Sequence, residues 1–163
     1  MVCCHTTFRG FIIMNAIINI LFPPFTHTRG SIGLLVLRLL MGIGIALHGW
    51  GKVGHIEAFS EAVGVPVFLG FLAVAAELGG GILLALGALT PMVSAALTGN
   101  MVVAVMMHMS KGDPFLLTPT GDGYTAGWEF AALYLVGFIC ILLMGPGKLS
   151  LDYLIFRKNV SKS

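Results

Sequence analysis

The hydrophobic pattern of the chain consists of four long apolar stretches, which run over residues 32–51, 66–89, 91–109 and 127–145. Each has roughly the 20 apolar residues that a helix needs to cross a hydrocarbon core about 30 Å thick. Only Thr90 separates the second stretch from the third, which predicts a tight antiparallel hairpin with a proline in the first turn of its second helix. The pattern predicts an all-α fold, a four-helix transmembrane bundle.

The segments between and before these stretches are too short or too polar to span a bilayer. Residues 53–65 place apolar side chains at helical spacing, with two glutamates on another face, which predicts a short helix on the membrane surface; a solvated loop is the alternative. Residues 111–126 are rich in proline and glycine and should form a loop over the bundle. The apolar run 11–22 ends at a Pro-Pro pair, which predicts a second interfacial helix.

The chain should therefore divide into three parts. We expect an N-terminal interfacial segment over residues 1–30, a four-helix membrane domain over 31–153 and a basic cytoplasmic tail over 154–163. Met1 and Met14 are both candidate translation starts. The N-terminal part lacks a clear basic region and a small-residue cleavage site, which argues against a cleaved signal peptide.

Composition supports a membrane protein and excludes several other classes. The chain is 57% hydrophobic and 10% charged, with a mean hydropathy of +0.96, far from the roughly one quarter of charged residues in globular proteins. Its partner is the lipid bilayer. A net charge of +2 is too small to indicate nucleic acid. The three cysteines form neither a CxxC pair nor a zinc spacing, so no metal site is expected.

Lysine and arginine predict how the protein is oriented in the membrane. The two long loops hold only Lys52 and Lys111, whereas basic residues are more numerous in the terminal segments. Because basic residues concentrate on the cytoplasmic side, both termini should be cytoplasmic and the two loops external. The basic residues of the terminal segments are Arg9, Arg29, Lys148, Arg157, Lys158 and Lys162.

Two ionisable residues lie deepest in the apolar stretches. Each costs about 2.5 to 3.5 kcal/mol at a helix centre, so each needs a partner or a function. Arg38 in the first stretch and Glu77 in the second are offset by about 6 Å along the membrane normal if both helices start at the membrane surface. We expect an intramembrane Arg38–Glu77 ion pair, which either fixes the helix register or handles protons or a ligand. Three glycines after Leu78 predict a close approach of a helix or a ligand there.

A second polar set is expected at the outward end of the bundle. It comprises His48, Lys52, His108 and Glu129, which lie near the ends of three helices. Arg38, His48 and Lys52 share one side of the first helix, so we hypothesise that an opening lined by His48, Lys52 and Glu129 leads toward Glu77. The alternative is that the histidines anchor the helix ends at the interface. Two histidines on separate helices could also ligate a haem, although no second pair is present.

Several separated motifs together resemble the DoxX family of small bacterial membrane proteins, over roughly residues 31–153. The first is Leu-Arg-Leu at 37–39, followed by Gly42 and by His-Gly-Trp-Gly-Lys at 48–52. The others are Gly-Val-Pro at 64–66, Glu-Leu-Gly-Gly at 77–80, the turn at 87–91, Gly-Trp-Glu at 127–129 and Gly-Pro-Gly-Lys-Leu-Ser-Leu-Asp at 145–152.

This resemblance implies a multi-pass protein of the bacterial plasma (inner) membrane. Some relatives are associated with membrane oxidoreductase complexes, including a thiosulfate:quinone oxidoreductase and a complex with superoxide dismutase and a sulfurtransferase. The polar positions of the family correspond to Arg38, Lys52, Glu77 and Glu129 in this sequence. Family membership does not determine the chemistry.

Three functions remain open at this stage. The first is a membrane subunit of a quinone-linked or sulfur- and redox-stress oxidoreductase system, in which Glu77 and Arg38 manage a proton or a carbonyl of a quinone-like ligand. The second is a small proton-coupled transporter, which with four helices would have to form a homo-oligomer. The third is a membrane scaffold for soluble redox enzymes. No redox cofactor motif is evident, and whether the protein is an enzyme is not indicated by the sequence.

Overall fold

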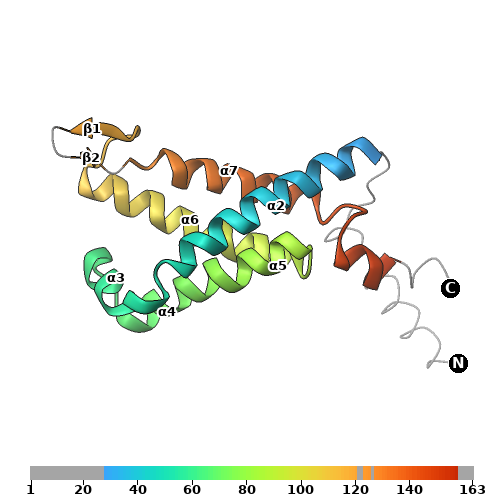
Figure 1. Ribbon diagram of the computed structural model, residues 1–163, viewed down its shortest axis with the longest axis horizontal. Helices are drawn as coiled ribbons and strands as arrows, with labels where there is room; N and C mark the ends of the chain where they lie inside the picture. Colours follow the sequence, from blue (N-terminus) through green and yellow to red (C-terminus); the bar gives the residue numbers. More distant parts are fainter. Residues whose placement is uncertain (1–27, 121–122, 126, 158–163) are drawn as a thin grey trace, which may run out of the picture.

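The computed structural model describes residues 28–120, 123–125 and 127–157, and their regular secondary structure is helical except for one short hairpin (Figure 1). The segment predicted at 11–22 and most of the basic tail lie outside the described residues. In chain order the elements are α2 (Thr28–Trp50), η1 (Val53–His55), α3 (Ile56–Val63), α4 (Val67–Ala75), η2 (Ala76–Gly80), α5 (Gly81–Leu86), α6 (Thr90–Lys111), β1 (Thr118–Thr120), β2 (Gly123–Thr125), α7 (Glu129–Met144) and η3 (Tyr153–Arg157).

Three helical segments are long and apolar enough to cross a membrane: Arg29–Val63, Val67–Leu86 and Thr90–Lys111. No more than 33% of the residues in the apolar window of each segment are buried inside the protein. Their large apolar side chains therefore face outward, as they would toward acyl chains. The fourth apolar stretch forms α7, a shorter helix of 16 residues.

The second spanning helix contains a π-helical turn. Elements α4, η2 and α5 run without interruption from Val67 to Leu86, and η2 (Ala76–Gly80) widens the helix in its middle. Single-turn π segments inside α-helices occur frequently at functional sites. This one carries Glu77.

Helix α2 packs against this π-containing helix through glycines. A Cβ added at Gly42 would lie 2.6 Å from the Gly81 carbonyl oxygen, and one added at Gly81 would lie 2.6 Å from the Gly42 carbonyl oxygen. Only glycine permits such a close approach of two backbones. Of the three consecutive glycines, only Gly81 makes the close approach that the sequence predicts, and it makes it with α2; a Cβ at Gly79 would meet nothing within 4 Å, and one at Gly80 would make ordinary contact with α6.

The segments between the spanning helices match the expectations in part. Residues 53–65 are helical, as predicted, in η1 and α3. The loop predicted over residues 111–126 contains an antiparallel hairpin in which Thr118 pairs with Thr125. Its strands have three residues each, too short for an alternating pattern to be visible in the sequence.

The C-terminal segment fastens the turn between α5 and α6. The carboxylate of Asp152 accepts hydrogen bonds from the backbone N–H groups of Leu89 and Thr90, each at 2.7 Å, and so satisfies donors at the start of α6. The backbone N–H of Asp152 donates to the Gly87 carbonyl at 2.9 Å. Asp152 is 2% exposed, so these contacts are shielded from water.

Arg38 belongs to this same assembly. Its side chain is fully buried, donates to the Leu149 carbonyl and lies against Gly87. Asp152 is near enough for its negative charge to favour this guanidinium, although among the described residues no ion pair within 4.0 Å joins the two. Within the described part of the chain, Nε and one terminal nitrogen of Arg38 have no hydrogen-bond partner.

The helices diverge toward one end of the molecule. Figure 1 shows the C-terminal segment beside the α5–α6 turn at one end, and α3 and the β-hairpin at the other, where α4 and α6 lie apart. We call the second end the cavity end. The buried apolar cluster that joins the helices is formed by Leu34, Ile45, Leu84, Val93, Leu97, Met101, Phe138 and Ile141.

Candidate functional site

A cavity of about 1030 Å³ lies between the helices at the cavity end. Its walls come from α2, α3 and α4 on one side and from α6 and α7 on the other, and most of its lining is apolar. A mostly apolar pocket of this size with a few convergent polar groups is typical of a small-molecule binding site. The lining residues with charged or hydrogen-bonding side chains are His48, Lys52, Glu77, Asn100, His108, Lys111 and Tyr134.

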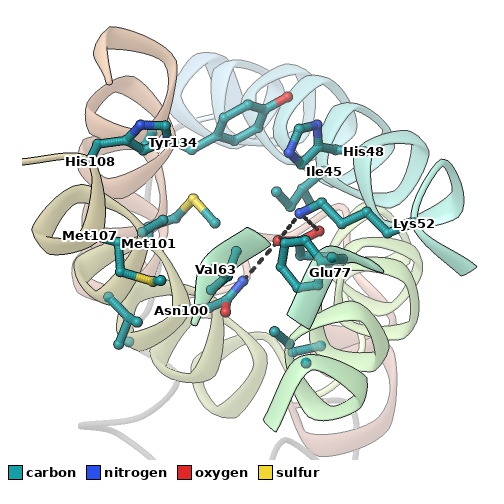
Figure 2. A pocket seen from close by; sticks show the side chains of 18 of the residues that line it. Ile45, His48, Lys52, Val63, Glu77, Asn100, Met101, Met107, His108 and Tyr134 are labelled. Atoms are coloured by element: carbon teal, nitrogen blue, oxygen red, sulfur yellow. Dashed lines mark hydrogen bonds and ion pairs between the residues drawn. The ribbon is translucent and has the colours of Figure 1, made fainter. Parts of the chain in front are cut away.

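The centre of the site is a bidentate ion pair between Lys52 and Glu77. The Lys52 ammonium lies 2.9 Å and 2.7 Å from the two carboxylate oxygens, and the Asn100 amide donates to the first of these oxygens at 3.1 Å (Figure 2). The side chains of Lys52 and Glu77 are 18% and 5% exposed. An ion pair this far from water is stable only because each charge is paired and hydrogen-bonded.

Local structure places these three side chains together. The π turn sets Glu77 on the inner face of its helix, and Gly49 allows α2 to approach it: a Cβ at Gly49 would lie 2.7 Å from the Leu78 backbone nitrogen. Lys52 follows the end of α2 and reaches back toward the carboxylate. Its ammonium also lies 4.6 Å from the centre of the Phe59 ring, a cation–π contact that ties α3 to the site.

Other polar side chains occupy the rest of the cavity wall. In the view of Figure 2, His48 and Tyr134 lie above the ion pair, and His108 lies on the opposite side of the pocket from Lys52. The Tyr134 hydroxyl lies against Gly44, one helical turn before His48. His108 Nδ1 lies 2.7 Å from Asp113 Oδ2. The cavity thus has polar groups on two sides of an apolar interior.

Comparison with known proteins identifies the family. The DoxX family model matches residues 33–109. A protein named "Putative oxidoreductase CatD" from Bacillus subtilis (strain 168) is 31% identical over 130 residues, which cover 78% of this chain and 90% of that protein. The chain belongs to the DoxX family. Inner membrane protein YqjF of Escherichia coli (strain K12) is 29% identical over 137 residues, which cover 78% of this chain and 95% of that protein. No solved structure matches the chain with significance.

The DoxX match contains the centre of the cavity. Lys52, Glu77 and Asn100 all lie within residues 33–109, as do both cavity histidines, whereas Tyr134 lies beyond it on α7. The family assignment, the inner-membrane relative and the apolar helices together make this chain a membrane protein.

The ion pair predicted between Arg38 and Glu77 is wrong for this DoxX protein. The contact of Gly42 with Gly81 sets the register of the two antiparallel helices and places Arg38 beside Gly87. Gly87 follows Glu77 by ten residues, which corresponds to about 15 Å along a helix and exceeds the reach of an arginine side chain. The predicted offset of about 6 Å between the two residues was wrong because it assumed that each helix starts at the membrane surface.

Of the four residues predicted to form the outward polar set, only three lie at the cavity. His48, Lys52 and His108 line it, but Glu129 is not among its lining residues. One oxygen of Glu129 lies 3.3 Å from the Leu117 backbone nitrogen, so this carboxylate faces the loop before α7. The carboxylate of the cavity is Glu77 instead.

Sequence reasoning missed Asn100, Tyr134 and Phe59. It weighed ionisable residues within the apolar stretches, and an uncharged amide in the third stretch has a lower expected cost. Asn100 is nevertheless the most polar uncharged side chain in its stretch, which was an available signal. Among the described residues, no three His, Cys, Asp or Glu side chains come together as metal ligands, and Cys140 is a free thiol.

Proposed function

We propose that this DoxX protein is the membrane subunit of an oxidoreductase system and binds a lipid-soluble quinone in the cavity. The observation that carries the proposal is the hydrogen-bonded Lys52–Glu77–Asn100 cluster inside an otherwise apolar pocket of about 1030 Å³. A quinone has a matching form, with carbonyl oxygens on an apolar ring and a long apolar tail.

The cluster can recognise a quinone head group through its donors. Each quinone carbonyl is an acceptor only, and Lys52 and Asn100 carry three and two N–H groups, of which Glu77 occupies some. Glu77 holds the Lys52 ammonium in place through two hydrogen bonds, so that its remaining N–H group can donate to a carbonyl. When bound, a quinone supplies an acceptor of two electrons and two protons.

Apolar side chains of both α4 and α6 line the cavity, which favours an apolar ligand dissolved in the bilayer. Leu69, Leu72 and Val103 line the cavity and are 46% to 52% exposed. A wall of exposed apolar side chains can hold an apolar tail away from water. A water-soluble substrate gains nothing from such a wall.

Electrons would come from a partner. In this proposal the chain's own residues bind and orient the quinone and hold its protons. A soluble redox enzyme that docks on the protein would deliver the electrons. The name of the Bacillus relative is consistent with such a system.

The membrane arrangement in this proposal has four crossings. Helix α7 extends over about 24 Å at 1.5 Å per residue and lies along α6 and α2 (Figure 1). With the turns at both of its ends it can complete a fourth crossing. The excess of basic residues in the terminal segments supports a cytoplasmic location of both termini, with the cavity end facing outward.

The proposal is tested by extracting the gently solubilised, purified protein and quantifying its quinones by chromatography. We expect about one isoprenoid quinone per chain, the occupancy of a tight single site. Purified protein that carries no quinone, and that binds none when it is added, contradicts the proposal.

A proton-coupled transporter is the second candidate, because a buried ion pair in a spanning segment is also typical of proton-coupled carriers. Measuring the flux of small solutes in proteoliposomes distinguishes a transporter from a quinone-binding subunit. A pH-driven flux of a small solute without bound quinone would favour the transporter.

A further inference from the structure

The end of helix α6 joins a histidine to a carboxylate at the rim of the cavity. Gly112 adopts the left-handed conformation with φ of 77°, its N–H donates to the Met109 carbonyl, and the N–H of Asp113 donates to the His108 carbonyl, each at 3.1 Å. This geometry brings the first side chain after the glycine onto the side chain five residues earlier, where a hydrophobic contact is usual. Here the contact is polar: His108 Nδ1 lies 2.7 Å from Asp113 Oδ2.

His108 connects the cavity with its surroundings. Its side chain is 34% exposed and lines the cavity, and that of Asp113 is 25% exposed. Within the described part of the chain, its second ring nitrogen, Nε2, has no hydrogen-bond partner. Glu77, in contrast, is 5% exposed and already bonded to two side chains, so it exchanges protons with water far less readily.

We propose that His108 is the group that exchanges protons between the cavity ligand and water, and that Asp113 is its positioning residue. The inference rests on the proposed function, because it assigns a role to a residue of the same site. A carboxylate accepts hydrogen bonds only, so Asp113 holds the proton of a neutral imidazole on Nδ1 and leaves the Nε2 lone pair for the ligand.

The other titratable groups at the cavity are engaged elsewhere or lack a partner that fixes them. Lys52 and Glu77 pair with each other, Lys111 donates to the Ala62 carbonyl, and Glu129 lies at the loop backbone. Among the described residues His48 has no carboxylate bonded to its ring. The titratable groups in and beside the cavity, apart from His108, are His48, Lys52, Glu77, Lys111, Glu129 and Tyr134.

This arrangement predicts opposite pH dependences for the two forms of the ligand. A protonated His108 has an Nε2–H that donates to a quinone carbonyl, so quinone binding takes up one proton from water. A neutral His108 has an Nε2 lone pair that accepts from a hydroquinone hydroxyl, so hydroquinone binding to a protonated site releases one proton. Quinone should therefore bind more tightly at low pH, and hydroquinone more tightly at high pH.

The test measures the Kd of a short-chain ubiquinone and of its hydroquinone, anaerobically, for the full chain in detergent. Between pH 6 and pH 8, the range where imidazoles change charge, we expect the quinone Kd to rise by about tenfold and the hydroquinone Kd to fall by a similar factor. His108→Gln should bind both forms with pH-independent Kd values.

A second pair of variants keeps the test decisive if His108→Gln does not fold. Asp113→Ala should raise both Kd values, because the imidazole is no longer held, whereas Asp113→Asn retains an acceptor for Nδ1–H and should restore most of the affinity. Wild-type binding that does not vary with pH contradicts the inference alone. So does a pH dependence that survives in His108→Gln or is lost only in His48→Gln. Absence of quinone binding at every pH contradicts the proposed function and this inference with it.

Discussion

Replacing Glu77 by glutamine should destabilise the protein by about 3 kcal/mol, because it leaves the Lys52 ammonium without its carboxylate in a site where only 18% of the Lys52 side chain is exposed. Lys52→Met should cost a similar amount, since it strands the buried carboxylate. The same two changes should each weaken quinone binding about tenfold or more, equivalent to at least roughly 1.4 kcal/mol. Thermal unfolding in detergent and quinone titration measure the two effects.

The double variant distinguishes this ion pair from two unrelated charges. Lys52→Met combined with Glu77→Gln removes both charges, so its stability should recover part of the summed loss, whereas quinone binding should stay weak because the donors are gone. Glu57→Gln is the matched control, since Glu57 is an exposed glutamate on α3 with little expected effect on either measurement. Strict additivity of the two single changes in unfolding free energy would mean that Lys52 and Glu77 do not interact.

Asp152→Ala should be equally damaging at the other end of the protein. The change removes the acceptor of two backbone N–H groups at the start of α6 and leaves the fully buried Arg38 without the charge that opposes it. We expect a loss of about 3 to 5 kcal/mol in the free energy of unfolding, measured by thermal unfolding in detergent. Folded Asp152→Ala protein should still bind quinone, because the cavity lies at the opposite end.

Two double-mutant cycles assign the partner of Arg38. Arg38→Gln and Asp152→Asn should couple strongly, whereas Arg38→Gln and Glu77→Gln should add, because about 15 Å of helix separates the two sites. Coupling of Arg38 to Glu77 and additivity with Asp152 would contradict the register that the Gly42–Gly81 contact sets.

Much of the fold follows from the sequence, because apolar length and turn residues are local signals. Three of the four predicted spanning helices, the proline in the first turn of α6 and the helix at 53–65 appear where the pattern predicts them, whereas the fourth stretch forms the shorter α7. The register between α2 and the following helix could not be predicted in the same way. It depends on which glycines meet, and Gly42, Gly44 and Gly49 on α2 offer several solutions at different heights.

The register of α2 against its neighbour determines which basic side chain reaches Glu77. A shift of α2 along its neighbour by about ten residues exchanges Arg38 for Lys52 as the partner of Glu77, although all three were recognised as polar residues that need partners. The π turn, which directs Glu77 inward, has no periodic signal in an apolar stretch. The pairing of His108 with Asp113 depends on the left-handed Gly112, and the sequence showed only a helix end followed by a turn.

The central claim, that a lipid-soluble quinone occupies the cavity between α4 and α6, is tested most directly by two neighbouring valines. Val103 lines the cavity and is 52% exposed, whereas Val102 is 40% exposed and is not part of the lining. Bound quinone per chain should be measured after identical purification of the wild-type protein, Val103→Trp and Val102→Trp. We predict that Val103→Trp, whose indole occupies part of the cavity, retains about one tenth or less of the wild-type quinone, while Val102→Trp retains nearly all of it. Equal quinone content in the two variants would contradict the claim.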